Sequence, residues 1–207
     1  MIIRKIRREN PSQKVIDEAI SVMERGGAVI YPTDTIYGLG VNALDGESVR
    51  KLFRIKGRAP DKPVSICVSR VSEIPRFSKP SEHAMEVIKR ILPGPYTVLL
   101  EKKDLVPDIL TGGSSKVGVR VPDDEVCRRI SARFPVTATS ANISGRQPSA
   151  NPYDIIGDLE VDLMLDAGEC DSTEPSTVVD LTVEPPAVLR MGRGDPEVIH
   201  RIFRCIR

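Results

Sequence analysis

The stretch "YPTDTIYGLG", Tyr31–Gly40, decides how the fold is interpreted, because an apolar run meets a polar turn there. The run "AVIYP", residues 28–32, is short and apolar, which is typical of a buried strand. Two threonines, an aspartate and two glycines follow, and glycines let a backbone turn close to a ligand. We therefore expect a buried strand that ends in a polar, ligand-facing loop.

Strand-like and helix-like patterns alternate along the rest of the chain. Further strands are expected at residues 1–6, 64–68, 96–102, 116–122, 136–139, 163–167, 176–181 and 187–191. One helix is expected to follow Asn10 as N-cap, with Gln13 as its capping-box partner, and a second to end at Gly57. Others are expected at residues 85–92, 125–134, 153–159 and 196–206. Because some strands follow one another directly, we predict a single α/β domain over residues 1–207, with a mixed sheet and flanking helices.

Composition excludes several function classes. The chain has 207 residues, 40% of them hydrophobic, which suits one globular domain with a substantial core. The formal net charge of +1 gives no global field toward nucleic acid or an anionic membrane. No segment is apolar for long enough to cross a bilayer or to act as a signal peptide, so we expect a cytoplasmic protein.

Histidine and cysteine chemistry is also restricted. The two histidines, His83 and His200, both fall in expected helices, which argues against a serine–histidine triad or a multi-histidine metal site. The four cysteines are far apart and form no C-x-x-C pair. We expect them to be reduced and to pack as small apolar residues.

Polar loops at the ends of the expected strands share hydroxyl, glycine and isolated basic residues. Backbone N–H groups in such turns, together with lysine or arginine, form sites for phosphate or carboxylate groups. No P-loop and no G-x-G-x-x-G opens a helix, so a bound nucleotide would need a different cradle. The loops lie at residues 32–40, 56–63, 111–120, 139–150, 175–180 and 189–194.

In this order, the motifs "YPTDTIYGLG", "KGRAPDKP", "KVGVRVP", "TSANISGRQPS", "PSTVVDLT" and "VLRMGRG" resemble the YrdC-like family of threonylcarbamoyl-AMP synthases, in its single-domain form. The resemblance covers almost the whole chain. It implies a twisted α/β sheet around a large basic cavity. It also implies formation of threonylcarbamoyl-AMP and pyrophosphate from L-threonine, bicarbonate and ATP with Mg²⁺. A separate tRNA threonylcarbamoyltransferase complex would use the product to modify adenosine 37 of tRNA.

The resemblance also implies roles for individual residues. Residues that would contact ATP are Lys56, Arg58, Lys62, Lys116, Ser140, Asn142, Ser149 and Arg190. Residues that would contact threonine are Thr35, Cys67, Arg120 and Ser176, with Arg120 holding the carboxylate. Three features depart from the family pattern: Lys62 replaces an asparagine of one branch, Cys67 replaces a common histidine, and the segment before Ser149 is one residue longer.

The expected reaction needs no protein nucleophile. The carbamate formed on the threonine amine attacks the α-phosphorus of ATP, so catalysis rests on positioning and countercharge. Two questions about the first loop stay open at this point. Thr35 could instead cap a turn, and Thr33 could make the substrate contact in its place.

Two rival hypotheses remain. A module that binds double-stranded RNA or tRNA without catalysis would use local basic groups at Arg4, Lys5, Arg7 and Arg8 and at Arg201, Arg204 and Arg207. Only 4% of residues are aromatic, which argues against a stacking platform for single strands. A hydrolase or carbamoyltransferase acting on other adenylates would turn over without threonine.

Overall fold

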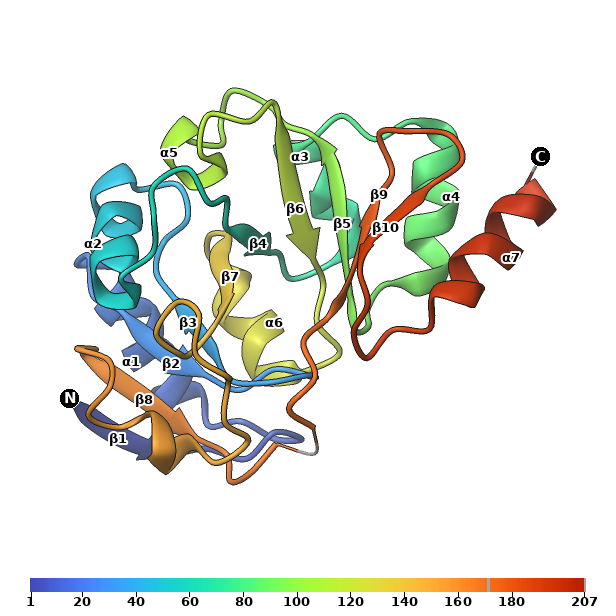
Figure 1. Ribbon diagram of the computed structural model, residues 1–207. Helices are drawn as coiled ribbons and strands as arrows, with labels where there is room; N and C mark the ends of the chain where they lie inside the picture. The colour runs from blue at the N-terminus through green and yellow to red at the C-terminus, as the bar shows by residue number, and fades with distance from the viewer. Residues whose placement is uncertain (171, 207) are drawn as a thin grey trace.

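A computed structural model describes residues 1–170 and 172–206. Ten strands form one mixed sheet in the order β1-β8-β2-β3-β7-β4-β6-β5-β9-β10 (Figure 1). The strands are β1 (Ile2–Lys5), β2 (Val29–Tyr31), β3 (Gly38–Gly40), β4 (Ser65–Cys67), β5 (Tyr96–Glu101), β6 (Lys116–Arg120), β7 (Val136–Ser140), β8 (Leu163–Asp166), β9 (Thr177–Asp180) and β10 (Ala187–Arg190). The α/β class and the mixed sheet with flanking helices are as predicted.

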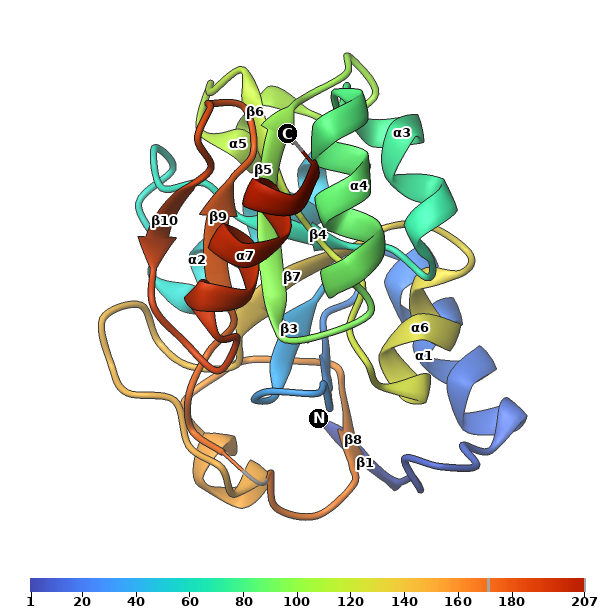
Figure 2. The same cartoon turned by 90° about the vertical axis from the view of Figure 1, so that its right-hand side faces the viewer.

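The helices cover the sheet in separate groups. They are α1 (Gln13–Glu24), α2 (Gly46–Lys56), α3 (Ile74–Phe77), α4 (Glu82–Ile91), α5 (Asp108–Thr111), α6 (Glu125–Ser131) and α7 (Pro196–Ile206), with 3-10 turns η1 (Val71–Glu73) and η2 (Pro152–Ile155). Figure 2 shows α4 and α7 side by side in front of β5 and β9, and α1 beside α6 lower down. The N- and C-termini lie at opposite sides of the molecule (Figure 1).

Two helix predictions are wrong. The first helix begins at Gln13 with Ser12 at the N-cap position, so Asn10 does not cap it and no capping box forms. Pro11 is buried, and its backbone carbonyl accepts a hydrogen bond from Arg129 on α6. Residues 10 and 11 therefore lie before the helix and are held against α6. The helix expected at residues 153–159 is only the short turn η2, because Gly157 at φ +94° reverses the backbone.

Strand β3 was not expected from the sequence. It lies within the opening stretch, pairs antiparallel with β2 and β7, and consists of Gly38, Leu39 and Gly40. The ring of Tyr31 lies against both glycines: a Cβ on Gly38 would come within 2.8 Å of that ring, and one on Gly40 within 2.6 Å. Glycine is therefore required here by the close approach of an aromatic ring. The polar loop is the connection of a β2–β3 hairpin.

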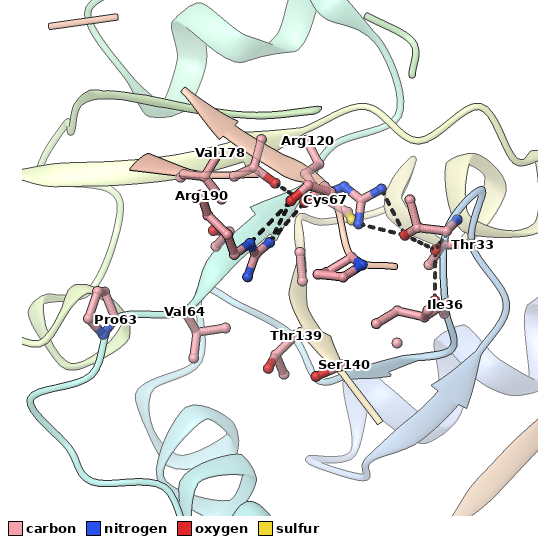
Figure 3. A pocket seen from close by; sticks show the side chains of 18 of the residues that line it. Thr33, Ile36, Pro63, Val64, Cys67, Arg120, Thr139, Ser140, Val178 and Arg190 are labelled. Carbon is pink, nitrogen blue, oxygen red and sulfur yellow. Dashed lines mark hydrogen bonds between the residues drawn. The ribbon is translucent and has the colours of Figure 1, made fainter. Parts of the chain in front are cut away.

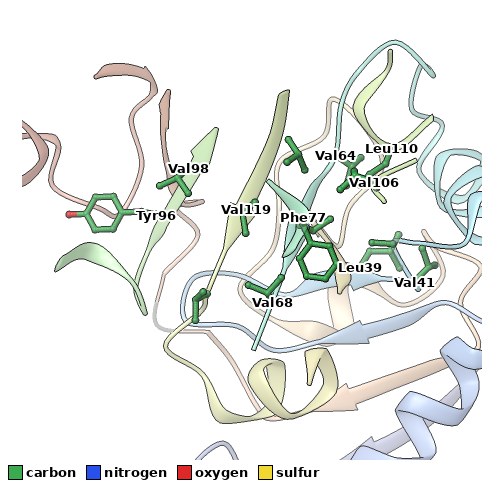
Figure 4. Close-up of a cluster of buried hydrophobic side chains, with 14 of the residues drawn as sticks. Leu39, Val41, Val64, Val68, Phe77, Tyr96, Val98, Val106, Leu110 and Val119 are labelled. Atoms are coloured by element: carbon green, nitrogen blue, oxygen red, sulfur yellow. The ribbon is translucent and has the colours of Figure 1, made fainter. Parts of the chain in front are cut away.

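The middle strands divide the molecule into a core face and a polar face. On β5 and β6, Val98, Leu100, Val117 and Val119 are buried in the main hydrophobic cluster, part of which Figure 4 shows. The residues that alternate with them, among them Thr97, Lys116 and Arg120, line a cavity. Because successive side chains of a strand point to opposite faces, the pattern "KVGVR" places basic and small residues on one face and valines on the other.

Candidate functional site

A cavity of about 380 Å³ lies on this polar face, where β4, β5, β6, β7, β9 and β10 contribute side chains. Figure 3 shows it from close by. Eight of the twelve residues that the sequence analysis assigned to a site line it: Thr35, Arg58, Cys67, Lys116, Arg120, Ser140, Ser176 and Arg190. Segments far apart in the sequence therefore meet at one place.

The two threonines of the first loop have different structural roles. Thr33 Oγ1 accepts the backbone N–H of Thr35 and donates to the carbonyl of Ile36, so Thr33 is the hydroxyl that stabilises the turn. Thr35 Oγ1 shares a 3.0 Å hydrogen bond with Thr33 Oγ1 and accepts two 3.3 Å hydrogen bonds from the Arg120 guanidinium. Both hydroxyls line the cavity, and Thr35 is the one joined to Arg120.

Arg120 lies at the end of β6 and forms a buried ion pair. Its Nη2 donates to Asp34 Oδ1 at 2.7 Å, and the two side chains are only 10% and 9% exposed. Separating such a pair would leave each buried charge without its partner, which is strongly unfavourable. The guanidinium is thereby fixed against the first loop.

A second fixed arginine lies across the cavity. Arg190 Nη2 donates to the carbonyl of Ser176 at 2.8 Å and to its hydroxyl at 3.2 Å. Ser176 Oγ also shares a 2.8 Å hydrogen bond with Thr97 Oγ1. Burial, and after it the neighbouring Arg120, lower the pKa of Arg190, and an arginine keeps its charge under such shifts.

Two further basic side chains complete the lining. Arg58 follows the left-handed C-cap Gly57 of α2 and donates to the backbone carbonyls of Lys62 and Pro63. Lys116 Nζ pairs with Asp180 Oδ2 at 2.9 Å. No aspartate or glutamate of the described ranges lines the cavity itself. The cavity is therefore basic, and its chemistry suits anions such as phosphate and carboxylate.

Cys67 lies at the floor of the cavity with no exposed surface. Its sulfur accepts a 3.8 Å contact from the Tyr31 hydroxyl, which also donates to the Thr137 carbonyl. The neighbouring Cys127, and after it Arg120, lower the pKa of Cys67. All four cysteines are free thiols; Cys67, Cys127 and Cys170 are buried as expected, whereas Cys205 is exposed, so the prediction that it packs as an apolar residue is wrong.

Lys56 does not line the cavity and lies behind it. Its ammonium is buried and donates to the carbonyls of Ser140 at 2.5 Å and Asn142 at 2.7 Å. The backbone carbonyl of Lys56 accepts from Ser144. Burial, and to a smaller extent Arg58, lowers the pKa of Lys56 to about 7. The contacts make Lys56 the residue that shapes the turn after β7.

Three more predicted residues do not line the cavity. Lys62 is exposed on the loop after α2. Asn142 donates to the carbonyls of Ile143 and Arg146, and its Oδ1 accepts from Ser140 Oγ. Ser149 Oγ donates to Asp154 at 2.7 Å. Their assigned ATP contacts stay predictions.

Some lining residues were not assigned from the sequence. Thr97, Thr139 and Ser65 place polar groups on the same face, and each lies within or beside a strand. The signal that reveals Thr97 is alternation, since Tyr96, Val98 and Leu100 point into the core while Thr97 and Leu99 do not. A polar residue out of phase with a buried strand's apolar residues faces the other side.

Residues 1–170 and 172–206 contain no cluster of three or more histidine, cysteine or acidic side chains that could hold a metal ion. The cavity lining therefore does not fit a resident Mg²⁺ site built from protein carboxylates. Mg²⁺ that enters with a nucleotide is instead held mainly by phosphate oxygens and water.

Comparisons with known proteins identify the family. A sequence profile of Sua5, YciO and YrdC proteins, described as telomere recombination, matches residues 21–192. A threonylcarbamoyl-AMP synthase of Pyrococcus abyssi is 36% identical over 97% of this chain and 60% of its own length. No helix in the described part of this chain is long and apolar enough to cross a membrane.

Solved structures agree with this family in fold and sequence. The crystal structure of P. abyssi Sua5 complexed with L-threonine has a TM-score of 0.91 and 35% identity, over 98% of this chain and 61% of that one. The chain thus spans about three fifths of that relative. A Methanobacterium thermoautotrophicum protein solved in solution is 71% identical over 95% of this chain and 96% of its own, with a TM-score of 0.73. The chain belongs to the Sua5/YciO/YrdC family.

Proposed function

We propose that this protein is a threonylcarbamoyl-AMP synthase, a nucleotidyltransferase that forms threonylcarbamoyl-AMP and pyrophosphate from L-threonine, bicarbonate and ATP. The observation that carries the proposal is the convergence of eight motif residues on one basic cavity. Relatives that share this fold include a protein named for this activity and one solved with L-threonine.

The cavity offers separate groups for the threonine carboxylate and for the ATP phosphates. We assign three lining residues to L-threonine, with Arg120 holding its carboxylate and Thr35 and Ser176 as further contacts. We assign four other lining residues to the ATP substrate: Arg58, Lys116, Ser140 and Arg190. In the proposed complex these basic groups balance the charge of the triphosphate, which enters with Mg²⁺ as part of the nucleotide substrate.

The proposed chemistry requires alignment more than proton transfer. A carbamate on the threonine nitrogen attacks the α-phosphorus, the new P–O bond forms, and pyrophosphate leaves with the electrons of the broken P–O bond. Preorganised arginines stabilise the charge that develops, because their positions are fixed by ion pairs and carbonyl contacts before substrate arrives. The product would pass to a tRNA threonylcarbamoyltransferase complex.

Pyrophosphate release tests the proposal. The purified protein is incubated with MgATP, L-threonine and bicarbonate, and each is omitted in turn. We expect release only when all three are present, and a loss of about 10-fold or more in Arg58→Ala, since charge-assisted contacts contribute about 1.5–3 kcal/mol. Release that persists without threonine would favour a hydrolase acting on other adenylates.

A further inference from the structure

A basic cavity poses a problem for an amino-acid substrate, whose α-amino group is positive at neutral pH. Arg58, Lys116, Arg120 and Arg190 all line the cavity, and each repels an ammonium group. A buried ammonium needs a carboxylate or several hydrogen-bond acceptors nearby. The question is which acidic side chain of this protein supplies that charge.

Two buried carboxylates lie directly behind the lining. Asp180 is fully engaged: Oδ1 accepts from the backbone and hydroxyl of Thr182, and Oδ2 accepts from Lys116. Asp34 is only partly engaged. Its Oδ1 accepts from Arg120, while its Oδ2 has no partner. Only the Asp34 carboxylate therefore has an oxygen to spare.

The ion pair that contains the unpartnered oxygen also contains an unpartnered donor. Within residues 1–170 and 172–206, the buried side-chain polar atoms without a hydrogen bond are Asp34 Oδ2 and Arg120 Nε. A guanidinium and a carboxylate side by side usually form two parallel hydrogen bonds. Here Nη2 to Oδ1 is made at 2.7 Å and the second is not. Leaving both groups unpaired and buried is unfavourable, which marks this pair for a ligand.

The ligand that complements the open half of the pair has one donor and one acceptor close together. An α-amino acid carries its amino group and its carboxylate on the same carbon atom. Its N–H groups can donate to Asp34 Oδ2 while its carboxylate accepts from Arg120. Thr35 Oγ1, already 3.3 Å from two Arg120 nitrogens, lies at the same place.

The backbone around Asp34 is held by arginines from outside the cavity. Arg193 donates to the Asp34 carbonyl at 2.5 Å. Arg8 donates to the Thr33 carbonyl and to Asp124, both at 2.7 Å. Arg8 and Arg193 line a second hollow on the other side of this loop. The loop is anchored there. Asp34 itself lines this second hollow, and Thr33 and Thr35 on either side of it line both spaces, so Asp34 reaches the main cavity through its pair with Arg120.

We propose that Asp34 binds the α-amino group of the amino-acid substrate through Oδ2 while Arg120 binds its carboxylate. The proposal rests on the function proposed above and adds the residue that distinguishes an amino acid from a hydroxy acid. In the complex, Asp34 Oδ1 keeps its hydrogen bond from Arg120 Nη2, and Oδ2 accepts from the amino group.

A ligand pair separates this role from a purely structural one. Calorimetry measures binding of L-threonine and of 3-hydroxybutanoate, which lacks the amino group, to the wild type, to Asp34→Asn and to Asp158→Asn. We expect Asp34→Asn to bind threonine about 10- to 100-fold more weakly, as expected for a lost hydrogen bond to a charged group, and to bind 3-hydroxybutanoate no more weakly than the wild type does. Asp158, exposed and paired with Arg146, is the matched control and should change neither.

Equal weakening of both ligands would overturn the proposal, because it would mean that Asp34 only holds Arg120 in place. Unchanged threonine binding in Asp34→Asn would overturn it as well. If circular dichroism shows that Asp34→Asn is unfolded, Asp34→Glu serves instead, with the same selective loss expected and the same equal loss contradicting it. A wild type that binds no threonine overturns the proposed function together with this inference, whereas the other negative outcomes overturn this inference alone.

Discussion

Arg120 shows how much of the site one residue organises. Its guanidinium donates to the Asp34 carboxylate and to the Thr35 hydroxyl, and its side chain lines the cavity. The sequence predicted Arg120 and Thr35 from their motifs. It did not predict that Asp34 joins them, because an acidic residue in a turn is equally suited to capping the local backbone.

Replacing Arg120 by lysine should impair threonine use much more than ATP use. A lysine offers a point charge and cannot form the paired contacts of a planar guanidinium. We expect KM for threonine to rise about 10-fold or more, with KM for ATP changing less than about 3-fold, measured by pyrophosphate release. Arg133→Lys, on an exposed arginine paired with Glu24, is the control. Equal increases in both KM values would contradict the assignment of Arg120.

Lys56 gives a pH dependence whose sign follows from its burial. The pKa of Lys56 is about 7 in the folded protein and 10.5 ordinarily, so between these values the unfolded chain binds more protons. The free energy of unfolding of the wild type, relative to that of Lys56→Met, should therefore rise from pH 7 toward pH 10. This gain should be lost as the pH falls through 7. Urea unfolding of both proteins at pH 6, 7.5 and 9 measures this. Parallel pH curves would show that Lys56 keeps its usual pKa.

At the scale of elements, periodicity and glycine positions explain which predictions succeeded. The strands with β-branched residues, such as "KVGVR" and "TVVD", were found because their patterns are strong. Strand β3 was missed because "GLG" has poor strand propensity. Its formation depends on packing against Tyr31, a contact that exists only once the β2–β3 hairpin has formed. A helix was expected at residues 153–159 because the spacing of apolar residues there resembles that of a helix. The helical turn is shorter because Gly157 has a positive φ.

The β2–β3 hairpin should be sensitive to any side chain at Gly40. A Cβ there would lie 2.6 Å from Tyr31 Cε1 and 2.6 Å from Val136 Cγ1. We expect Gly40→Ala to lower the free energy of unfolding by about 1–3 kcal/mol, the usual cost of overpacking. Gly46→Ala, where the nearest atom is Arg50 Nη1 at 3.7 Å, should change it by less than about 0.5 kcal/mol. Denaturant titration that finds the two variants equal would contradict the packing argument.

At the scale of the whole molecule, charge argues against an RNA-tracking surface. Strand β1, which carries Arg4 and Lys5 of one basic group, and helix α7, which carries Arg201 and Arg204 of the other, lie on opposite sides of the molecule (Figure 1). Several members are already paired: Arg4 with Glu18, Arg8 with Asp124 and Arg201 with Asp195. Arg207 lies outside the described residues. With a net charge of only +1, the molecule as a whole does not attract RNA strongly enough to make up for the small number of unpaired basic residues.

Binding of duplex RNA should consequently be weak. We expect a Kd above about 10⁻⁴ M at 150 mM salt, the weak end of non-specific binding. Fluorescence anisotropy over 50–200 mM salt measures it. A tighter Kd that weakens by about 10³-fold across that range would instead support the RNA-binding module.

In the proposed reaction, this cavity joins a bicarbonate-derived carbon to threonine and to AMP. Mass spectrometry of a reaction with ¹³C-bicarbonate, L-threonine and MgATP detects that product. We expect an adenylate that contains threonine and one ¹³C atom, formed at a rate matching pyrophosphate release. Pyrophosphate release with an adenylate that carries no ¹³C, or with no adenylate at all, would contradict it.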